Sequence, residues 1–335
     1  MLIYTVRRFV SSILVLLVTS FIAFMFTAAS YDPLKRYRAQ NPQPTKAFMQ
    51  GKEHLYHLDQ GVLARYWDWL VHLLRFHASF PPVSFNFGND VNSAPVSSAL
   101  AQRLEITTRL IFAAIVVALI ISIVGGVVSG VRRGKPIDVS VTFLTFLLLA
   151  LPTFWFAALL KEMAIKSNRT LSTHLYTAFD ETPGLSSYGT SSQILHDQLS
   201  HLILPTISLA LLTAAGWIRY QRASTIEVLD ADYMRLARAK GVRNRTVIRR
   251  HGLRNALIPL VTVAAIDAGA LFGGAIITEK VYVWHGMGDY LNTALANEDT
   301  YAVVGWVMVS AIFVVLFNFL ADLLYAAIDP RIRLA

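Results

Sequence analysis

Long runs without charged residues dominate the pattern of this sequence. Five runs contain no Asp, Glu, Lys or Arg: residues 9–31, 110–131, 139–160, 198–218 and 300–321. About 20 helical residues cross a bilayer core of about 30 Å, so each run is long enough to span a membrane. Within lipid a segment must pair its own backbone N–H and C=O groups, which favours helices. A sixth stretch, residues 255–278, is interrupted only by Asp267 and is also predicted to be a helix.

Two other interpretations apply to single runs. One such run is also typical of a helix buried in a soluble core, but six in one chain favour six membrane-spanning helices. The first run resembles a signal peptide, because Arg7 and Arg8 precede it and small residues stand at positions 28–30. A signal peptide has an apolar region of about 7–15 residues, and this run is longer. We therefore expect an uncleaved first span.

The composition supports a membrane protein. Of the 335 residues, 55% are apolar and only 15% are charged, whereas soluble domains are about 25% charged. This argues against a soluble enzyme, a disordered chain, a coiled coil and a collagen-like rod. The net charge of +9 suits nucleic acid or an anionic membrane face; with six spans, membrane lipid is the expected partner and nucleic acid is not. The absence of cysteine excludes disulfides, thiolate metal sites and Cys nucleophiles.

The basic residues predict the orientation. Six spans place four segments on one side of the membrane: residues 1–8, 132–138, 219–254 and 322–335. These segments hold 17 of the 30 Lys and Arg residues, and 10 of the 17 lie in the third segment. Long translocated loops follow the positive-inside rule weakly, so the short and dense basic segments decide. We expect a multi-pass protein of the plasma membrane with both termini in the cytoplasm.

The segments on the opposite side differ in character. Residues 32–51 are rich in Pro, Lys and Arg and are predicted to be extended, and residues 161–200 are predicted to be irregular. An amphipathic helix is expected where apolar residues recur at helical spacing: Leu63, Tyr66, Trp67, Leu70, Leu73 and Leu74. Three aromatic residues are expected at the outer membrane interface: Tyr282, Trp284 and Tyr290.

The sequence lacks motifs for catalysis. It contains no G-x-x-x-x-G-K-[ST] phosphate loop and no H-E-x-x-H motif. Two histidine pairs could ligate a metal, His54 with His57 and His196 with His201, but surface loops explain both pairs better. We predict no catalytic residue, no metal site and no hydrolysis of ATP by this chain itself.

The segment between the fourth and fifth spans carries the strongest signal. Asp230 or Asp232 is expected to cap a helix over residues 233–240, and Gly241 to end it in the left-handed conformation that glycine tolerates. One interpretation is a basic loop lying on anionic lipid. A short helix with small residues, Ala237 and Ala239 before Gly241, fits a groove of a partner protein better.

Several motifs resemble one family. Residues 233–241, 251–256 and 259–262 are similar to the cytoplasmic signature of binding-protein-dependent ABC importer permeases, most closely the dipeptide, oligopeptide and nickel branch. Further similar segments are residues 2–10, 276–279 and 329–333. The sequence departs from the general signature at Arg235-Leu236-Ala237, where the family has Glu-Ala-Ala, and at His285, where it has Pro.

The resemblance implies a coupling helix that sits in a cleft of an ATPase subunit. The residues expected to make this contact are Asp232, Tyr233, Arg235, Ala237, Arg238, Ala239, Lys240 and Gly241. It also implies a second homologous permease subunit, two cytoplasmic ATPase subunits or domains and an extracytoplasmic peptide-binding protein. ATP and Mg would be bound by the partner subunits, and no cofactor is expected on this chain.

Small residues and one carboxylate stand out within the spans. Gly126 and Gly130 are four residues apart, as are Gly269 and Gly273, a spacing that lets helices approach closely. They could pack within this subunit or against the second permease. Asp267 would cost about 2.5–3.5 kcal/mol facing lipid. It could line the translocation path and meet a peptide's ammonium group, or hold two helices together by a hydrogen bond.

The predicted fold is therefore all-α, a polytopic integral membrane protein with six transmembrane helices, like a type I ABC importer permease. Residues 1–31 form an N-terminal segment and the first helix, residues 32–100 an outer subdomain, and residues 101–335 a permease core with a cytoplasmic coupling loop at 219–254.

The predicted function is that of a transmembrane permease subunit of an ATP-driven peptide importer. The alternative is a self-sufficient channel or an ion-driven carrier, a class that often shows inverted repeats; none is apparent here. A membrane enzyme would need a convergent set of polar residues within the spans. The substrate stays open among dipeptides, longer peptides, glutathione, nickel chelates and haem.

Overall fold

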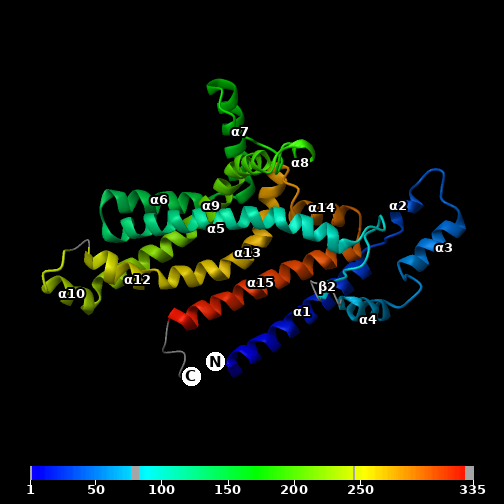
Figure 1. The fold of residues 1–335 in the computed structure, drawn as a ribbon, viewed down its shortest axis with the longest axis horizontal. Helices are drawn as coiled ribbons and strands as arrows, with labels where there is room; N and C mark the ends of the chain where they lie inside the picture. The colour runs from blue at the N-terminus through cyan, green and yellow to red at the C-terminus, as the bar shows by residue number, and fades with distance from the viewer. Residues whose placement is uncertain (1, 77–82, 244–245, 329–335) are drawn as a thin grey trace. The chain divides into compact units, whose positions relative to one another are not determined.

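The computed structural model describes residues 2–76, 83–243 and 246–328 and is almost entirely helical (Figure 1). Five helical segments are long and apolar enough to cross a membrane: Arg7–Ser30, Val96–Val131, Ser191–Asp230, Leu253–Gly273 and Thr300–Ala321. A sixth crossing is present if one bent pair of helices counts as a single span. The predicted all-α polytopic fold is confirmed. The predicted motif at residues 329–333 lies outside the described residues.

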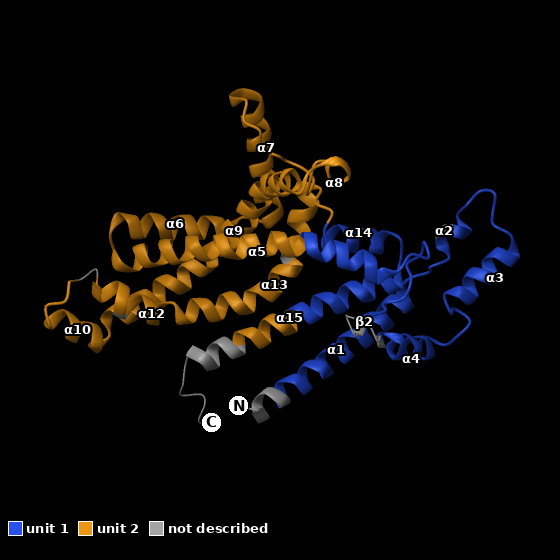
Figure 2. Ribbon diagram, in the orientation of Figure 1, with its two compact units in different colours: residues 1–106, 286–313 blue, residues 107–285, 314–335 orange. Residues whose placement is uncertain are grey.

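The chain divides into two compact units (Figure 2). Unit 1 comprises Met1–Ile106 and Gly286–Phe313, and unit 2 comprises Thr107–His285 and Val314–Ala335. Two long helices, α5 (Val96–Val131) and α15 (Thr300–Ile328), contribute residues to both units. The predicted division at residues 31 and 100 stays a prediction.

Unit 1 combines the first long helix with the outer subdomain. Its other elements are α1 (Leu2–Ser30), α2 (Lys35–Arg38), α3 (Lys46–Leu55), α4 (Val62–His72), β1 (Leu74–Phe76), β2 (Val83–Phe85) and α14 (Met287–Ala296). β1 and β2 are antiparallel, with Leu74 opposite Phe85. Aromatic rings join α1 to α4, because the Phe24 and Tyr66 ring centroids are 5.6 Å apart.

The amphipathic helix expected in the outer segment is confirmed as α4, but its buried face differs from the expected one. Tyr66 and Trp69 are buried, whereas Leu63 and Trp67 are exposed. The prediction that residues 32–51 are extended is wrong, since α2 and part of α3 lie there. Thr45 caps α3 by accepting a hydrogen bond from the Phe48 N–H, a local stabilisation that a composition argument does not detect.

Unit 2 is built around α9, the longest helix of the chain. Its elements are α6 (Pro136–Ala150), α7 (Thr153–Leu171), α8 (Leu185–Tyr188), α9 (Ser191–Asp230), α10 (Asp232–Ala239), the π-helix η1 (Val247–Gly252), α12 (Leu253–Ala256) and α13 (Ile258–Tyr282). α6, α7, α12 and α13 all pack against α9. α9 therefore links the other membrane helices of this unit to the short helix α10.

The predicted third span, residues 139–160, is not one continuous helix. α6 and α7 meet at an angle of 106° at the Leu151-Pro152 step, where Leu151 is extended (φ −85°, ψ 133°). Proline has no backbone N–H to continue a helix and disfavours helical geometry in the residue before it. The 15 residues of α6 extend about 22 Å, which is shorter than the bilayer core.

One further expectation needs correction. Residues 161–200 are largely helical, because α7 continues to Leu171 and α9 begins at Ser191, after a capping box at Thr190. Tyr282 and Trp284 are buried within unit 2, and their location at the outer membrane interface stays a prediction. The Tyr282 hydroxyl lies 2.8 Å from the Ser208 hydroxyl and donates a hydrogen bond to the Ala157 carbonyl, so a polar network inside the protein satisfies it.

Candidate functional site

The helix predicted between the fourth and fifth spans is present as α10, one residue earlier than expected. Gly241 ends it with a φ of +74°, which favours glycine. The N–H groups of Gly241 and Val242 donate to the Arg238 and Ala237 carbonyls at 3.0 and 3.4 Å. The geometry is a left-handed C-terminal cap of the expected kind.

The start of α10 differs from the expected cap. The N-cap residue is Ala231, and it makes no side-chain cap hydrogen bond. The Asp230 carboxylate instead lies 3.8 Å from the Arg133 guanidinium. Asp232 is in the first turn of α10, and its carboxylate lies 3.5 Å from the Arg235 guanidinium. Ala231 is extended (φ −67°, ψ 147°), so the chain turns directly from α9 into α10 without an aspartate cap.

One face of α10 is anchored to the following helices. Met234 is fully buried, and a Cβ added to Gly252 would lie only 3.0 Å from the Met234 Cε. The Tyr233 hydroxyl accepts a hydrogen bond of 3.0 Å from the Asn255 side chain. α10 is therefore held against η1 and α12 as well as against the end of α9. Met234 was not predicted from the sequence, because its burial depends on η1, which packs against α10.

The rest of the α10 surface is exposed. Tyr233 and Leu236 are 43% and 57% exposed, and both lie on the same helical face as Lys240 by their i, i+3, i+7 spacing. Of the eight residues predicted to contact a partner, only Ala237 is half-buried. The other seven are exposed: Asp232, Tyr233, Arg235, Arg238, Ala239, Lys240 and Gly241. α10 thus presents an exposed surface of apolar and basic residues, and its contacts with neighbouring helices hold it in place.

Polar contacts tie the long helices of unit 2 together. The Trp217 indole N–H of α9 donates a 2.7 Å hydrogen bond to the Asp267 carboxylate of α13. Trp217 is buried and Asp267 is half-buried. This is the contact expected if Asp267 holds two helices together; its role in the translocation path stays a prediction.

Two other carboxylates were not singled out from the sequence. Glu279 of α13 is buried and accepts a 2.5 Å hydrogen bond from the Thr107 hydroxyl of α5. Asp138 of α6 is buried and accepts two hydrogen bonds from the Arg222 guanidinium of α9, at 2.6 and 2.8 Å. Asp138 lies in the first turn of α6, and Arg222 lies within α9, which continues to Asp230.

The four glycines predicted to pack helices occupy different surroundings. A Cβ on Gly126 would lie 2.5 Å from the Gln221 Cβ, and one on Gly130 would lie 2.8 Å from the Thr225 Cβ, both on α9. A Cβ on Gly269 would lie 3.0 Å from the backbone of α15, whereas one on Gly273 would meet no atom within 4 Å. Three of the four thus adjoin other helices of this chain.

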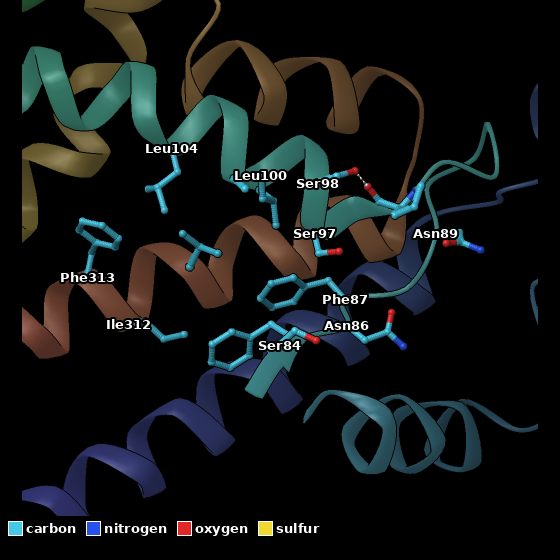
Figure 3. Close-up of a pocket in the computed structure, with 14 residues that line it drawn as sticks. Ser84, Asn86, Phe87, Asn89, Ser97, Ser98, Leu100, Leu104, Ile312 and Phe313 are labelled. Atoms are coloured by element: carbon cyan, nitrogen blue, oxygen red, sulfur yellow. Dashed lines mark hydrogen bonds between the residues drawn. The ribbon is translucent and has the colours of Figure 1, made fainter. Parts of the chain in front are cut away.

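Unit 1 contains a pocket of about 620 Å³ between β2, α5 and α15 (Figure 3). Leu100, Leu104, Ile312 and Phe313 form its apolar part, and Ser84 and other small polar residues line its edge. No residue that lines it carries an ionisable side chain. Among the residues that the structure describes, no three His, Cys, Asp or Glu side chains gather to hold a metal.

The long apolar helices and their buried polar links are those of a multi-pass membrane protein. The sequence belongs to a family of transport subunits: the model for the binding-protein-dependent transport system inner membrane component matches residues 122–334. The model for the N-terminal region of such membrane components matches residues 1–111. The chain is therefore a membrane component of a binding-protein-dependent transport system.

Curated relatives cover almost the full chain. The oligopeptide transport system permease protein OppB of Mycobacterium tuberculosis (strain ATCC 25618 / H37Rv) is 35% identical over 99% of both chains. The oligopeptide transport system permease protein AppB of Bacillus subtilis (strain 168) is 33% identical over 98% of this chain and 99% of its own. The dipeptide transport system permease protein DppB of Escherichia coli (strain K12) is 34% identical over 71% and 74%.

A solved structure supports the fold. A chain of the MetNI methionine ABC transporter in an inward-facing conformation superposes with a TM-score of 0.51 at 18% identity, covering 69% of this chain and 96% of that one. The predicted resemblance to ABC importer permeases is confirmed, and the alternative of a self-sufficient channel or ion-driven carrier is not supported.

Proposed function

We propose that this chain is one of two permease subunits of a peptide importer driven by ATP. The observation that best supports this proposal is the way α10 is held in place. Met234 is buried and anchors the helix, whereas Tyr233 and Leu236 stay exposed. An exposed apolar and basic surface at the end of a 40-residue helix suits a permanent contact with another protein. The names of the full-length relatives support peptides as the substrate class.

The proposed mechanism is mechanical. Two ATPase subunits or domains bind ATP and Mg and close, and the surface of α10 follows them. Because α10 is fixed to η1, α12 and the end of α9, its displacement moves α9. Hydrogen bonds such as Trp217–Asp267 then pass the movement to α13. The chain supplies coupling and half of the translocation path, and no catalytic step is assigned to it.

The proposal includes an orientation and a full assembly. α10 and both termini lie in the cytoplasm, and the outer subdomain with α4 faces the opposite side of the plasma membrane. On that side of the membrane an extracytoplasmic peptide-binding protein delivers the peptide to the permease. A second homologous permease completes the path. The basic residues in the turn before α6 and in the segment after α9 support this orientation.

Purification of the intact complex tests this proposal. Subunits with phosphate-binding loops should co-purify with the chain. A short peptide from a test panel should stimulate ATP hydrolysis by the complex only when the peptide-binding protein is present to bind it. Peptide uptake into vesicles by the chain alone, driven by an ion gradient, would contradict the proposal. The panel also separates dipeptides from longer peptides, glutathione, nickel chelates and haem.

A further inference from the structure

A groove between α6 and α9 in unit 2 has no role in the coupling described above. Its volume is about 530 Å³, within the range of ligand pockets, which is about 300–1,000 Å³. Thr142, Phe146 and Leu149 line it from α6, and Gly216, Arg219 and Tyr220 line it from α9. The two helices pack directly against each other and are drawn together in Figure 1.

The groove holds one cation that no carboxylate neutralises. Arg222, at one end, is occupied by its two hydrogen bonds to Asp138. Arg219, one helical turn away, makes no hydrogen bond or ion pair with any residue that the structure describes. Its guanidinium lies 5.0 Å from the centroid of the Phe146 ring. A guanidinium stacked on a ring keeps the N–H groups at its edge available to an anion in its plane.

The surroundings of Arg219 favour an anion further. The turn that leads into α6 carries exposed Arg132, Arg133 and Lys135. This turn is near Arg222, because Asp138 at the start of α6 accepts hydrogen bonds from both Gly134 and Arg222. Each basic residue near an anionic leaflet contributes about 1 kcal/mol of attraction. In the proposed orientation all of these residues face the cytoplasmic leaflet.

The rest of the groove is suited to hydrocarbon. Phe146 and Leu149 of α6 are 54% and 44% exposed, and exposed apolar surfaces of this kind mark contact with lipid or another protein. Arg219 stacks on Phe146, and from Phe146 to Leu149 the helix rises about 4.5 Å. A cation beside an exposed apolar surface matches a phospholipid better than a peptide, whose backbone needs hydrogen bonds along its length.

We propose that the groove between α6 and α9 binds an anionic phospholipid, with the phosphate on Arg219 and Tyr220 and an acyl chain along Phe146 and Leu149. The inference rests on the proposed membrane orientation. Since α9 carries α10, the lipid would sit against the helix that transmits the coupling movement.

Lipid retention by the purified importer complex tests the site. The complex is reconstituted in a mixture of phosphatidylethanolamine and phosphatidylglycerol, extracted, and examined by native mass spectrometry. Arg219→Gln should lower the retained phosphatidylglycerol about fivefold, which corresponds to about 1 kcal/mol. Arg219→Lys should retain most of it, because the charge is kept. Arg169→Gln, an exposed basic residue of α7 that lies outside the groove and outside the basic turn, is the matched control and should match the wild type. Equal retention by Arg219→Gln and the wild type, or an equal loss in Arg169→Gln, would overturn the proposal.

A photo-reactive amino acid at position 146 identifies the occupant directly, and this variant keeps Arg219. Irradiation should attach phosphatidylglycerol to the chain. An adduct with the second permease or with a labelled peptide, or no lipid adduct, would overturn the site. Peptide-stimulated ATP hydrolysis is measured in the same preparation. A lipid adduct in a complex that peptides do not stimulate would contradict the peptide function and leave the lipid site standing.

Discussion

At the scale of single residues, the account depends on what Asp267 does. Its carboxylate accepts a hydrogen bond from the buried Trp217 indole, so it joins α9 to α13. An Asn at this position can still accept that hydrogen bond through its amide oxygen but carries no charge. A Leu cannot accept it and would leave the indole N–H buried and unpaired, at a cost of about 1–3 kcal/mol.

We therefore predict that Asp267→Asn leaves assembly intact and lowers peptide uptake, whereas Asp267→Leu also lowers the thermal stability of the complex. Uptake into proteoliposomes and the melting temperature of the purified complex are the measurements. The Asn variant separates charge from hydrogen bonding. If its uptake equals that of the wild type, Asp267 has no role in the translocation path beyond holding two helices together.

At the scale of elements, the end of α10 is the sensitive point. Gly241 has a φ of +74°, and a residue with a Cβ is disfavoured there by about 1–2 kcal/mol. An acidic residue would also place a negative charge near the C-terminal end of the helix dipole, which is unfavourable.

Gly241→Asp should distort or repel the α10 contact and lower the stimulation of ATP hydrolysis by loaded binding protein at least severalfold. Gly184→Asp is the matched control, because Gly184 has a similar φ of +84°, is exposed and lies far from α10 in sequence. The control should keep normal stimulation. Full stimulation in the Gly241 variant would contradict the role of α10 in coupling.

The elements also show how far the sequence predicts this fold. Uncharged runs identify the membrane helices because exclusion of charge from lipid acts on each segment alone. The 106° bend between α6 and α7 was missed, although Pro152 marks it, because hydropathy does not register backbone geometry. The same limit hid α2 and α3 within a segment rich in polar residues.

Contacts between distant residues were least predictable. The glycine at the end of α10 could be placed because local backbone geometry demands it, whereas Met234 is an anchor only because η1, which contains Gly252, packs against it. Arg222 with Asp138, and Trp217 with Asp267, are 84 and 50 residues apart. Nothing in either local sequence encodes such a partner. The exposed surface of α10 was therefore predictable, but the contacts that hold α10 in place were not.

At the scale of the whole molecule, the proposed orientation assigns α4 and α10 to opposite sides of the membrane. The chain contains no cysteine, so a single introduced cysteine is a unique reporter. Trp67 of α4 is 65% exposed and Leu236 of α10 is 57% exposed, which makes the two sites comparable targets for a thiol reagent.

In intact cells, a membrane-impermeant maleimide should label Trp67→Cys and not Leu236→Cys, and both should be labelled in permeabilised membranes from which the partner subunits have been stripped. The cysteine-free wild type is the background control. Labelling of position 236 from outside intact cells would reverse the orientation and remove the basis for coupling on the cytoplasmic side.

The most direct test of the account is the identity of the protein that touches α10 in a working complex. Leu236→Cys is combined with a short bifunctional thiol cross-linker in membranes that retain peptide uptake, and the product is identified by mass spectrometry. The account predicts a cross-link to the subunit that binds ATP, with a yield that changes when ATP is added. A working complex in which position 236 links to no ATP-binding subunit would contradict it.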